Sequence, residues 1–313
     1  MTANEFPVAF VRTFAFLFGA LWGSFANVVI YRWPREMSVV RPGSHCFACQ
    51  KPVAPYDNLP ILSYVVLRGR CRHCGARFSP RYAIVELLFA VMATALAERV
   101  FFTPGDISVA HALAHWVVRF AFVFALLVTA FIDVDEMLVP WFTKWFAVAP
   151  LVAAILLPEL EPAVGWRMSL LGAAIGYLGL RVVFIDGYRL LTGRPGMGLG
   201  DAEVLLLVGA LLGPAGVLFA LGAGAVQGVI ATGIVALAGG RLGPGHASVV
   251  EDADGGEVDS GTGTDGDAEA GPTKFRAGTK VPFVPFLALA ALEYLLGADA
   301  LVNEYLSWVS ADG

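Results

Sequence analysis

Long apolar runs are the feature that most constrains what this chain can fold into. A helix needs about 20 mostly apolar residues to cross the hydrocarbon core of a bilayer. Candidate spans of this kind cover residues 6–30, 82–102, 111–132, 140–158, 166–186, 201–212, 214–240 and 282–297. The sixth is short, and only the Gly213-Pro214 boundary separates it from the seventh, so these two can also be drawn as one broken span.

These runs do not alternate between apolar and polar residues, as the strands of a transmembrane barrel do. Hydrophobic residues make up 57% of the 313 residues and charged residues only 15%, whereas soluble domains carry about 25% charged residues. A water-soluble fold would therefore expose too much apolar surface. We predict an all-α polytopic membrane protein with about eight transmembrane helices. The first is not a cleaved signal peptide, because it lacks a basic start and a small-residue cleavage site.

Lysine and arginine residues indicate the orientation, because they accumulate on the cytoplasmic side of membrane proteins. The connections near 103–110 and 158–166 contain neither. Residues 31–81 contain nine, namely Arg32, Arg35, Arg41, Lys51, Arg68, Arg70, Arg72, Arg77 and Arg81. We therefore expect residues 31–81 on the cytoplasmic side of the bacterial inner membrane, beside anionic lipid headgroups, with both termini outside.

The candidate spans and loops divide the chain into five parts. These are 1–30, the first span; 31–81, a small cytoplasmic domain; 82–240, a transmembrane catalytic core; 241–280, an acidic cytoplasmic loop; and 281–313, the last span and a C-terminal tail. Within the acidic loop, residues 247–272 contain eight acids and no bases. Such a stretch has little to bury and is predicted to be disordered.

The four cysteines form two Cys-x-x-Cys pairs inside the 31–81 domain. The pairs are Cys46-Phe-Ala-Cys49 and Cys71-Arg-His-Cys74, with 21 residues between them. Each pair can supply two sulfurs from one tight turn, as a tetrahedral zinc site needs. A redox dithiol is the alternative, but one pair would be enough for it, and no thioredoxin-like pattern is present. We predict a structural zinc site with all four cysteines as ligands and His45 and His73 as bystanders, because four thiolates leave no open position for catalysis.

Two groups of acids lie at the membrane edge, where ionisable residues are functional candidates. One is Asp133-Val-Asp135-Glu136, at the end of the third span, and the other holds Asp201 and Glu203, at the start of the sixth. The topology puts both on one face of the membrane. If Asp133 and Asp201 meet, they share a proton, and one can activate a water while the other protonates a carbonyl. Taken singly, Asp201 can also be an N-cap and the first group a solvated loop.

Helix ends distinguish the two aspartates. Asp201 lies at a helix N-terminus, where the helix dipole favours a carboxylate, and Asp133 lies at a C-terminus, where it favours the protonated acid. We therefore predict that Asp201 is the base. Just before it, Gly196, Gly198 and Gly200 lack Cβ atoms, which permits positive φ and a close approach of backbone to an extended substrate strand.

These residues belong to an ordered set of motifs that resembles the bacterial type IV prepilin peptidases, which are leader peptidases and N-methyltransferases. The resemblance covers roughly residues 19–297 outside the acidic stretch. A lone Gly-x-Gly-Asp is a weak signal, but the ordered set is specific. Its motifs are Gly23-Ser-Phe-Ala-Asn27-Val-Val-Ile-Tyr31-Arg32, both cysteine pairs, Asp57-Asn58-Leu-Pro60-Ile-Leu-Ser63-Tyr64, Leu67-Arg68-Gly69-Arg70-Cys71, Arg81-Tyr82-Ala-Ile-Val-Glu86, Asp133 with Pro140 seven residues on, Gly196-Met-Gly-Leu-Gly-Asp201, and Pro282-Phe283-Val-Pro285-Phe286.

The resemblance implies a membrane aspartic endopeptidase that cleaves a short basic leader from prepilin or pseudopilin precursors at the cytoplasmic face. It implies that the new N-terminus is then methylated, with S-adenosylmethionine as the methyl donor. It also implies that Asp133 and Asp201 are the catalytic pair, with Pro140, Gly198 and Gly200 as supporting residues of the same motifs. The sequence contains no Gly-rich nucleotide fingerprint, so the methyl-donor site stays unassigned.

Two positions depart from the family pattern. The family usually has Asp or Asn directly after the proline, where this chain has Trp141, and Lys two residues after the second aspartate, where it has Glu203. Neither departure removes a catalytic carboxylate. Glu86, about one turn into the second span, is either a side chain that reaches to the interface or a functional group. Asn27 is expected to make a helix–helix hydrogen bond.

Two other functions fit parts of the pattern. A transporter would use the acids as a proton relay, but transporter sites lie near the bilayer midplane, often between repeated halves, and this sequence has no internal repeat. A non-catalytic platform for pilus or secretion components would not need both Asp motifs. Nucleic acid is not an expected partner, and the sequence leaves the oligomeric state open.

Overall fold

The computed structural model describes residues 5–102, 107–156, 165–193, 198–238, 281–302 and 304. Apart from two isolated β-bridges, these ranges contain no strand, so the predicted all-α fold class is confirmed for them. The elements are α1 (Val8–Arg32), η2 (Trp33–Arg35), η3 (Pro55–Asn58), α2 (Leu62–Val66), α3 (Arg81–Phe101), α4 (Val109–Glu136), α5 (Thr143–Leu156), α6 (Trp166–Ala174), the π-helix η5 (Ile175–Gly187), α7 (Tyr188–Thr192), α8 (Leu199–Leu237), α9 (Val284–Glu293) and the π-helix η6 (Tyr294–Ala298).

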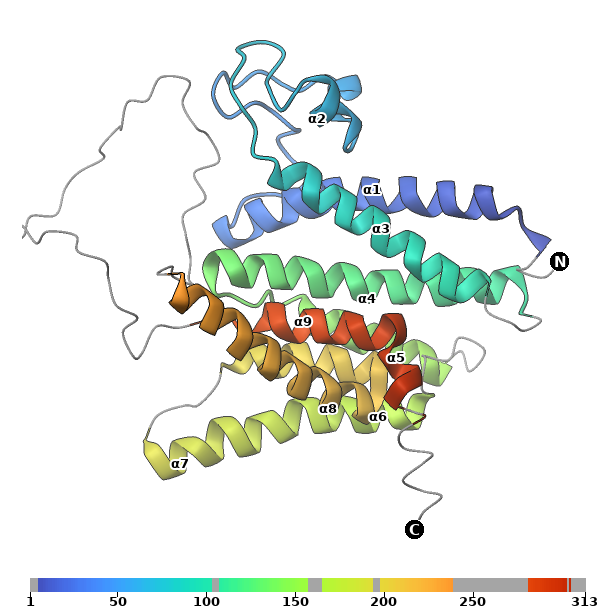
Figure 1. The fold of residues 1–313 in the computed structure, drawn as a ribbon, viewed down its shortest axis with the longest axis vertical. Coiled ribbons are helices and arrows are strands. Elements are labelled where there is room, and N and C mark those ends of the chain that lie inside the picture. The colour runs from blue at the N-terminus through green and yellow to red at the C-terminus, as the bar shows by residue number, and fades with distance from the viewer. Residues whose placement is uncertain are drawn as a thin grey trace, which may run out of the picture.

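Several helical runs in the described residues are long and apolar enough to cross a membrane. They are Val8–Arg35, Val109–Glu136, Trp166–Thr192, Leu199–Leu237 and Val284–Val302. α3 and α5 lie where the spans 82–102 and 140–158 were expected. The chain is therefore a multi-pass helical membrane protein, and its helices run roughly side by side across Figure 1.

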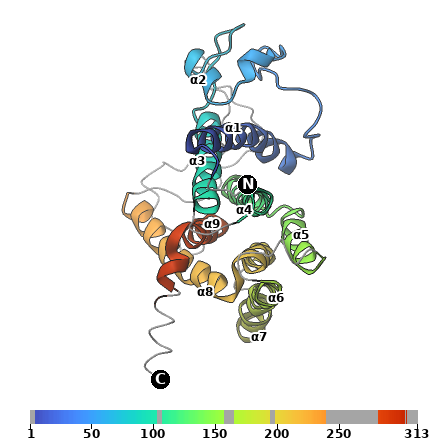
Figure 2. The same ribbon diagram turned by 90° about the vertical axis from the view of Figure 1, so that its right-hand side faces the viewer.

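α4 is the central helix of the bundle. Figure 2, which views many of the helices close to end-on, shows it between the α1–α3 pair and a second group that includes α5, α8 and α9. Its middle residues, among them Val123 and Leu126, are almost completely buried. Because α4 is packed on several sides, the polar residues Thr129 and Asp133 near its end are buried as well.

α1 and α3 pack closely because glycine keeps side chains out of their interface. Gly19 and Gly23 lie four residues apart on α1, and a Cβ atom on Gly23 would come within 2.7 Å of Glu86 Cα on α3. Small residues at this spacing allow two helix backbones to approach. Nearby, the Trp116 indole N–H donates to the Ala93 carbonyl at 2.9 Å, which joins α4 to α3.

α8 reverses direction at Gly213, where the sequence predicts a boundary between two spans. Gly213 has φ 71 and ψ −170, a conformation that is essentially open only to glycine. Pro214 follows and has no N–H to continue the helical hydrogen bonds across the break. Figure 1 shows the two halves of α8, yellow and orange, running in opposite directions. The predicted boundary is confirmed.

This reversal brings both ends of α8 to the same end of the bundle. Gly200, at the start of α8, lies against Val139 just after α4. Gly228, well into the second half, lies against Phe283, the residue before α9. The last turn of α4 and the first turn of α9 meet at this end, so four helix termini converge there.

The residues between α1 and α3 form a small domain beside that same end (Figure 1). It contains η2, η3 and α2. Arg32 is buried where α1 ends, and its guanidinium donates to the carbonyls of Ser38 at 3.0 Å and Pro42 at 2.8 Å. The acidic loop predicted over 241–280 lies outside the described residues.

Candidate active site and metal centre

Asp133 lies in the last turn of α4 and is only 7% exposed. One carboxylate oxygen, Oδ2, accepts a hydrogen bond at 3.2 Å from the backbone N–H of Val284, the first residue of α9. A buried carboxylate is stable only where hydrogen bonds or charges compensate for lost water. The start of α9 supplies such a donor, from a residue 151 positions further along the chain.

Asp201 lies in the first turn of α8, and its Oδ2 accepts a hydrogen bond at 3.2 Å from the backbone N–H of Gly198. The N-cap of α8 is Gly198, so the alternative that Asp201 is itself the N-cap is wrong. The structure brings the two predicted aspartates together, close enough for the carboxylates of Asp133 and Asp201 to interact electrostatically.

The prediction that Asp201 is the base rested on helix ends, and the structure places a second helix end beside Asp133. Asp201 lies at the N-terminus of α8, as expected. Asp133, however, lies not only at the C-terminus of α4 but also against the N-terminus of α9. Both carboxylates therefore face a positive helix end. The sequence could not show this, because nothing local to Asp133 indicates which distant helix begins beside it.

The other acids at the end of α4 are engaged by arginines. Arg81, the first residue of α3, makes two hydrogen bonds to Asp135, at 2.8 and 2.6 Å. Arg35 lies 3.1 Å from Glu136. Asp133 instead faces Asp201. Its partner therefore distinguishes Asp133 from the other two acids at the end of α4. Sequence reasoning missed Arg81 as a partner, although its place directly before a predicted span near other acids was the available signal.

The glycines before Asp201 serve close approach rather than unusual φ. Gly198 has φ −80 and ψ 150, and Gly200 is helical, so neither uses the positive φ that glycine permits. A Cβ atom on Gly200 would lie 2.9 Å from Val139 Cβ, so glycine there lets α8 reach the segment after α4. Gly196 lies outside the described residues. Pro140, one residue beyond Val139, is buried.

Pro140 starts the turn into α5, because its carbonyl accepts the Thr143 N–H at 3.0 Å. The Thr143 hydroxyl in turn lies 2.9 Å from the Thr129 hydroxyl, and both threonines are fully buried. This pair was not predicted. Thr129 lies four residues before Asp133, on the same face of α4, so helical spacing was the signal that could have indicated it.

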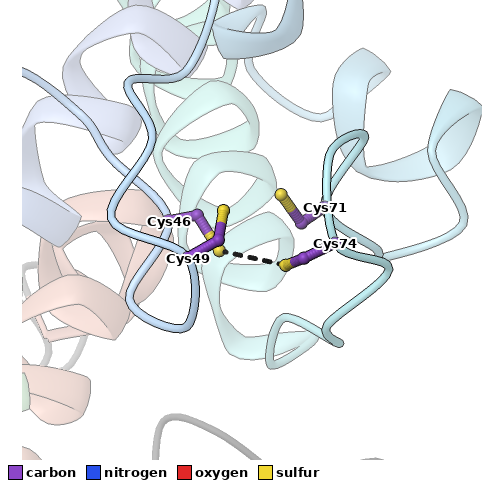
Figure 3. A group of neighbouring side chains, drawn as sticks. All are labelled: Cys46, Cys49, Cys71 and Cys74. Atoms are coloured by element: carbon purple, nitrogen blue, oxygen red, sulfur yellow. Dashed lines mark hydrogen bonds between the residues drawn. The ribbon is translucent and has the colours of Figure 1, made fainter.

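The four cysteines gather in the small domain. Figure 3 shows Cys46 and Cys49 on one loop facing Cys71 and Cys74 on another, and the four sulfur atoms lie within 4.8 Å of one another. Burial raises the pKa of the Cys71 thiol, but backbone N–H groups of Cys74 and His73 donate to its sulfur and bring the pKa to about 7. The group could hold a metal ion.

The two cysteine loops have the same backbone hydrogen bonds. In each, the first cysteine donates its N–H to the carbonyl five residues on and accepts from the N–H four residues on. The bonds are Cys46 to Lys51 at 2.9 Å, Gln50 to Cys46 at 2.8 Å, Cys71 to Ala76 at 2.8 Å and Gly75 to Cys71 at 2.9 Å. The two loops differ in sequence but have the same backbone shape, and each loop contributes two sulfur atoms to the cluster.

Two family models match the chain. The bacterial peptidase A24 N-terminal domain matches residues 17–100, which hold the cysteines, and the type IV leader peptidase family matches residues 120–233, which hold both aspartates. A prepilin leader peptidase/N-methyltransferase of Myxococcus xanthus is 35% identical over 247 residues, 78% of this chain and 70% of the relative. One of Aeromonas salmonicida is 30% identical over 323 residues, 94% and 93% of the two chains.

The chain belongs to the type IV leader peptidase family. No solved structure matches it.

The two departures from the family pattern fall beside the aspartates. Trp141 is 60% exposed and packs edge-on against Phe142. Glu203 lies one turn within α8, with one carboxylate oxygen 3.9 Å from the Lys144 ammonium of α5. The acid at 203 thus has a base on the neighbouring helix, and neither residue displaces Asp133 or Asp201.

Two other sequence candidates from the N-terminal half lie between α1, α3 and the small domain. The Asn27 side chain donates to the Tyr82 carbonyl at 3.0 Å, which confirms the predicted helix–helix hydrogen bond. Glu86 is half-buried and accepts the Ile61 N–H at 2.7 Å. Its carboxylate therefore faces the small domain of this leader peptidase homologue rather than reaching toward headgroups.

Gly200 generates a prediction about the fold of the site. We expect Gly200→Ala to destabilise the protein by about 1–3 kcal/mol, since overpacking costs this much, and Val139→Ala in the same chain to recover most of the loss. Gly198→Ala is the matched control, because its Cβ would meet no atom closer than 3.6 Å. Thermal unfolding in detergent measures the three variants beside wild type. Equal losses from the two glycine substitutions would contradict the close contact at Gly200.

Proposed function

We propose that this chain cleaves the leader peptide of prepilin-like precursors and methylates the new N-terminus, with Asp133 and Asp201 as the catalytic pair of an aspartic endopeptidase. Relatives along most of its length are named for both activities. The observation that best supports the peptidase is the meeting of Asp133 and Asp201, one from each of two helices, at the end of the bundle.

A carboxylate pair can hydrolyse a peptide bond without a serine or cysteine nucleophile. One carboxylate takes a proton from a water, whose oxygen attacks the scissile carbonyl, while the protonated partner donates to the carbonyl oxygen. The amine then leaves with a proton. The N–H groups of Val284 and Gly198 hold the two carboxylates in place for this exchange. Asp201 lies beside a helix N-terminus alone, whereas Asp133 also lies at the C-terminus of α4, so we keep Asp201 as the base.

The position of the pair suits a substrate anchored in the membrane. A prepilin or pseudopilin has an apolar helix, so its leader junction lies at the membrane surface, where helix termini meet in this bundle. Gly198 is exposed three residues before Asp201, and an open backbone there leaves room for an extended substrate strand. Gly200 and Pro140 bring the segments that carry the aspartates together.

We assign eight spans to the chain, with the two halves of α8 as the sixth and seventh. The end of the bundle that carries the aspartates and the small domain is then cytoplasmic, and both termini lie outside. This supports the five-part division, with 31–81 as the cytoplasmic domain and 82–240 as the catalytic core in the bacterial inner membrane. The nine basic residues of the domain then lie beside anionic lipid headgroups.

The cysteine cluster fits a structural zinc ion held by Cys46, Cys49, Cys71 and Cys74. Zinc–sulfur bonds of about 2.3 Å in a tetrahedron place the sulfur atoms roughly 3.8 Å apart, and the Cys46 and Cys74 sulfurs are 3.8 Å apart. Four thiolates complete the coordination shell. Zinc therefore folds the small domain and takes no part in hydrolysis.

Methylation needs a donor, and S-adenosylmethionine is the donor that the methyltransferase activity of the relatives implies. A methyl group on its sulfonium is open to attack by the free amine that leader cleavage creates. Glu86 lies in the half of the chain that the N-terminal family model matches, so it belongs with this second activity rather than with the aspartate pair.

The topology predicts where reporters are active. A phosphatase that works only outside the cytoplasm should be active when fused after residue 313 and inactive when fused within 31–81. The reason is that eight spans return the C-terminus to the side of the N-terminus. Phosphatase activity in cells expressing each fusion measures this. An inactive C-terminal fusion that is made and membrane-inserted contradicts an even number of spans.

The catalytic assignment predicts the effect of removing single carboxylates. Asp133→Asn and Asp201→Asn should each lower leader cleavage by about a thousandfold or more, since both members of such a pair act as one unit. Asp135→Asn is the control, and we expect it to keep cleavage within about tenfold, because Asp135 only pairs with Arg81. Cleavage of a prepilin by purified protein, with thermal unfolding as the check on folding, decides between them. Normal leader cleavage by Asp133→Asn or Asp201→Asn would contradict the assignment of these two residues as the catalytic pair.

The zinc assignment predicts metal content. Purified protein should contain one zinc ion per chain, and Cys46→Ser or Cys74→Ser should lose it, because three thiolates bind more weakly than four. His73→Ala is the control, since His73 is expected to be a bystander and should keep the metal. Elemental analysis after gel filtration measures the ratio. Full zinc in both cysteine variants would show that the ion lies elsewhere.

A further inference from the structure

A cavity of about 200 Å³ lies between the small domain and the ends of α1 and α3. It is separate from the aspartate pair, which does not line it. Its walls are rich in aromatic rings, from both the helices and the small domain. These are Tyr31, Phe47, Tyr64, Phe78 and Tyr82. A cavity with such walls and a few polar groups is the usual form of a small-molecule site.

Most of the charged groups of the cavity are already engaged within the protein. Arg72 donates to both carboxylate oxygens of Asp57, at 2.7 and 2.6 Å, and holds the pKa of Asp57 below its ordinary value. The Arg32 guanidinium donates hydrogen bonds to the carbonyls of Ser38 and Pro42. Arg72 thus neutralises the Asp57 charge, and the carbonyls occupy hydrogen-bond donors of Arg32.

The other two charged residues of the cavity, Glu86 and Arg70, form no ion pair among the residues that the structure describes. Glu86 accepts the Ile61 N–H at 2.7 Å, and no described base pairs with it. Arg70 lines the same cavity, and no described acid pairs with it. The cavity therefore offers one negative group, one positive group and aromatic surfaces. A complementary ligand carries a positive centre, a carboxylate and a flat ring.

We propose that this cavity binds S-adenosylmethionine, with Glu86 as the counter-charge to its positive end. The inference rests on the methyltransferase part of the proposed function and gives it a location. The aromatic rings suit the adenine base and a nearby cation, and Arg70 suits the carboxylate. In the transfer, the neutral amine bonds to the methyl carbon, the carbon–sulfur bond breaks with its electron pair left on sulfur, and the amine then loses a proton to water.

The first turn of α3 links this cavity to the aspartate pair. Arg81 makes two hydrogen bonds to Asp135, two residues after Asp133. The next residue, Tyr82, lines the cavity. Two consecutive residues of α3 thus contact the last turn of α4 and the cavity, so this turn lies between the cavity and the end of α4 that carries Asp133.

The cysteine loops form the other side of the cavity. Phe47, between the first two cysteines, lines it and lies 5.1 Å from Tyr31, measured between ring centres. Arg70, directly before Cys71, lines it as well. The metal centre thus holds Phe47 and Arg70, two of the proposed contacts, in position. This accounts for a zinc-folded domain in a chain whose hydrolytic groups lie in α4 and α8.

Equilibrium binding of S-adenosylmethionine and of S-adenosylhomocysteine to the full-length zinc-loaded protein in detergent tests the proposal. The second compound has the same ring and carboxylate but lacks the positive sulfur. Glu86→Gln keeps an oxygen for the Ile61 N–H and removes only the charge. We expect it to weaken S-adenosylmethionine binding roughly tenfold and S-adenosylhomocysteine binding clearly less, because only the former loses a charge interaction at the sulfur.

Two further variants complete the test. Arg70→Gln should weaken both compounds alike, since both carry the carboxylate. Glu98→Gln is the matched control, because Glu98 lies on the same helix outside the cavity and pairs with Arg12. Thermal unfolding of Glu86→Gln near the wild-type temperature shows that the variant folds.

Three outcomes overturn the proposal. If Glu86→Gln binds S-adenosylmethionine as tightly as wild type while wild type methylates, the donor site lies elsewhere and the proposed function stands. If Glu86→Gln instead raises the KM for the prepilin and leaves donor binding unchanged, the cavity holds the leader peptide. A wild type that cleaves but binds neither compound overturns both this inference and the methyltransferase assignment, and leaves the peptidase intact.

Discussion

The hydrogen bond between Val284 and Asp133 is the contact on which the rest of the site depends. A carboxylate that is almost fully buried has lost its water and needs donors from the protein. The donor comes from the last helix, so α9 must begin where α4 ends. This requirement places the start of α9 beside the end of α4. Because α4 is packed on several sides, the second carboxylate, Asp201, comes from another helix, α8. Burial of one acid thus dictates the arrangement of three helices.

Much of this architecture follows from the sequence. The apolar runs predicted the helices, and the Gly213-Pro214 pair predicted the break in α8. The cysteine spacing predicted the cluster, and the topology put Asp133 and Asp201 on one face. The contacts that refine the site were beyond reach, because they join residues far apart in the chain. The contact of Val284 with Asp133 leaves no local pattern, and the place of Arg81 directly before a predicted span did not by itself name Asp135 as its partner. Gly198 shows a different limit, since glycine suggested an unusual backbone and the structure has an ordinary one.

The two family models match different parts of the chain, and each part carries a different group of functional residues. Residues 17–100 carry the cysteines and the cavity, and residues 120–233 carry the aspartates. The division is not a separation in space, because glycine packing of α1 on α3, the Trp116 hydrogen bond to α3 and the Arg81 contact join the halves. A product released by one half is thereby near the other. Such proximity raises the local concentration of an intermediate without any need for tight binding.

The reversal at Gly213 also bears on how the family can vary. Because α8 returns to the end from which it started, the connection from Leu237 to Pro282 leaves and re-enters the bundle on one face. A connection that need not cross the membrane can lengthen at little expense, since each doubling of a flexible loop costs only about 0.6 kcal/mol. Insertions at this point preserve the number and direction of the helices. They also attach at the end of the bundle where Asp133 and Asp201 lie.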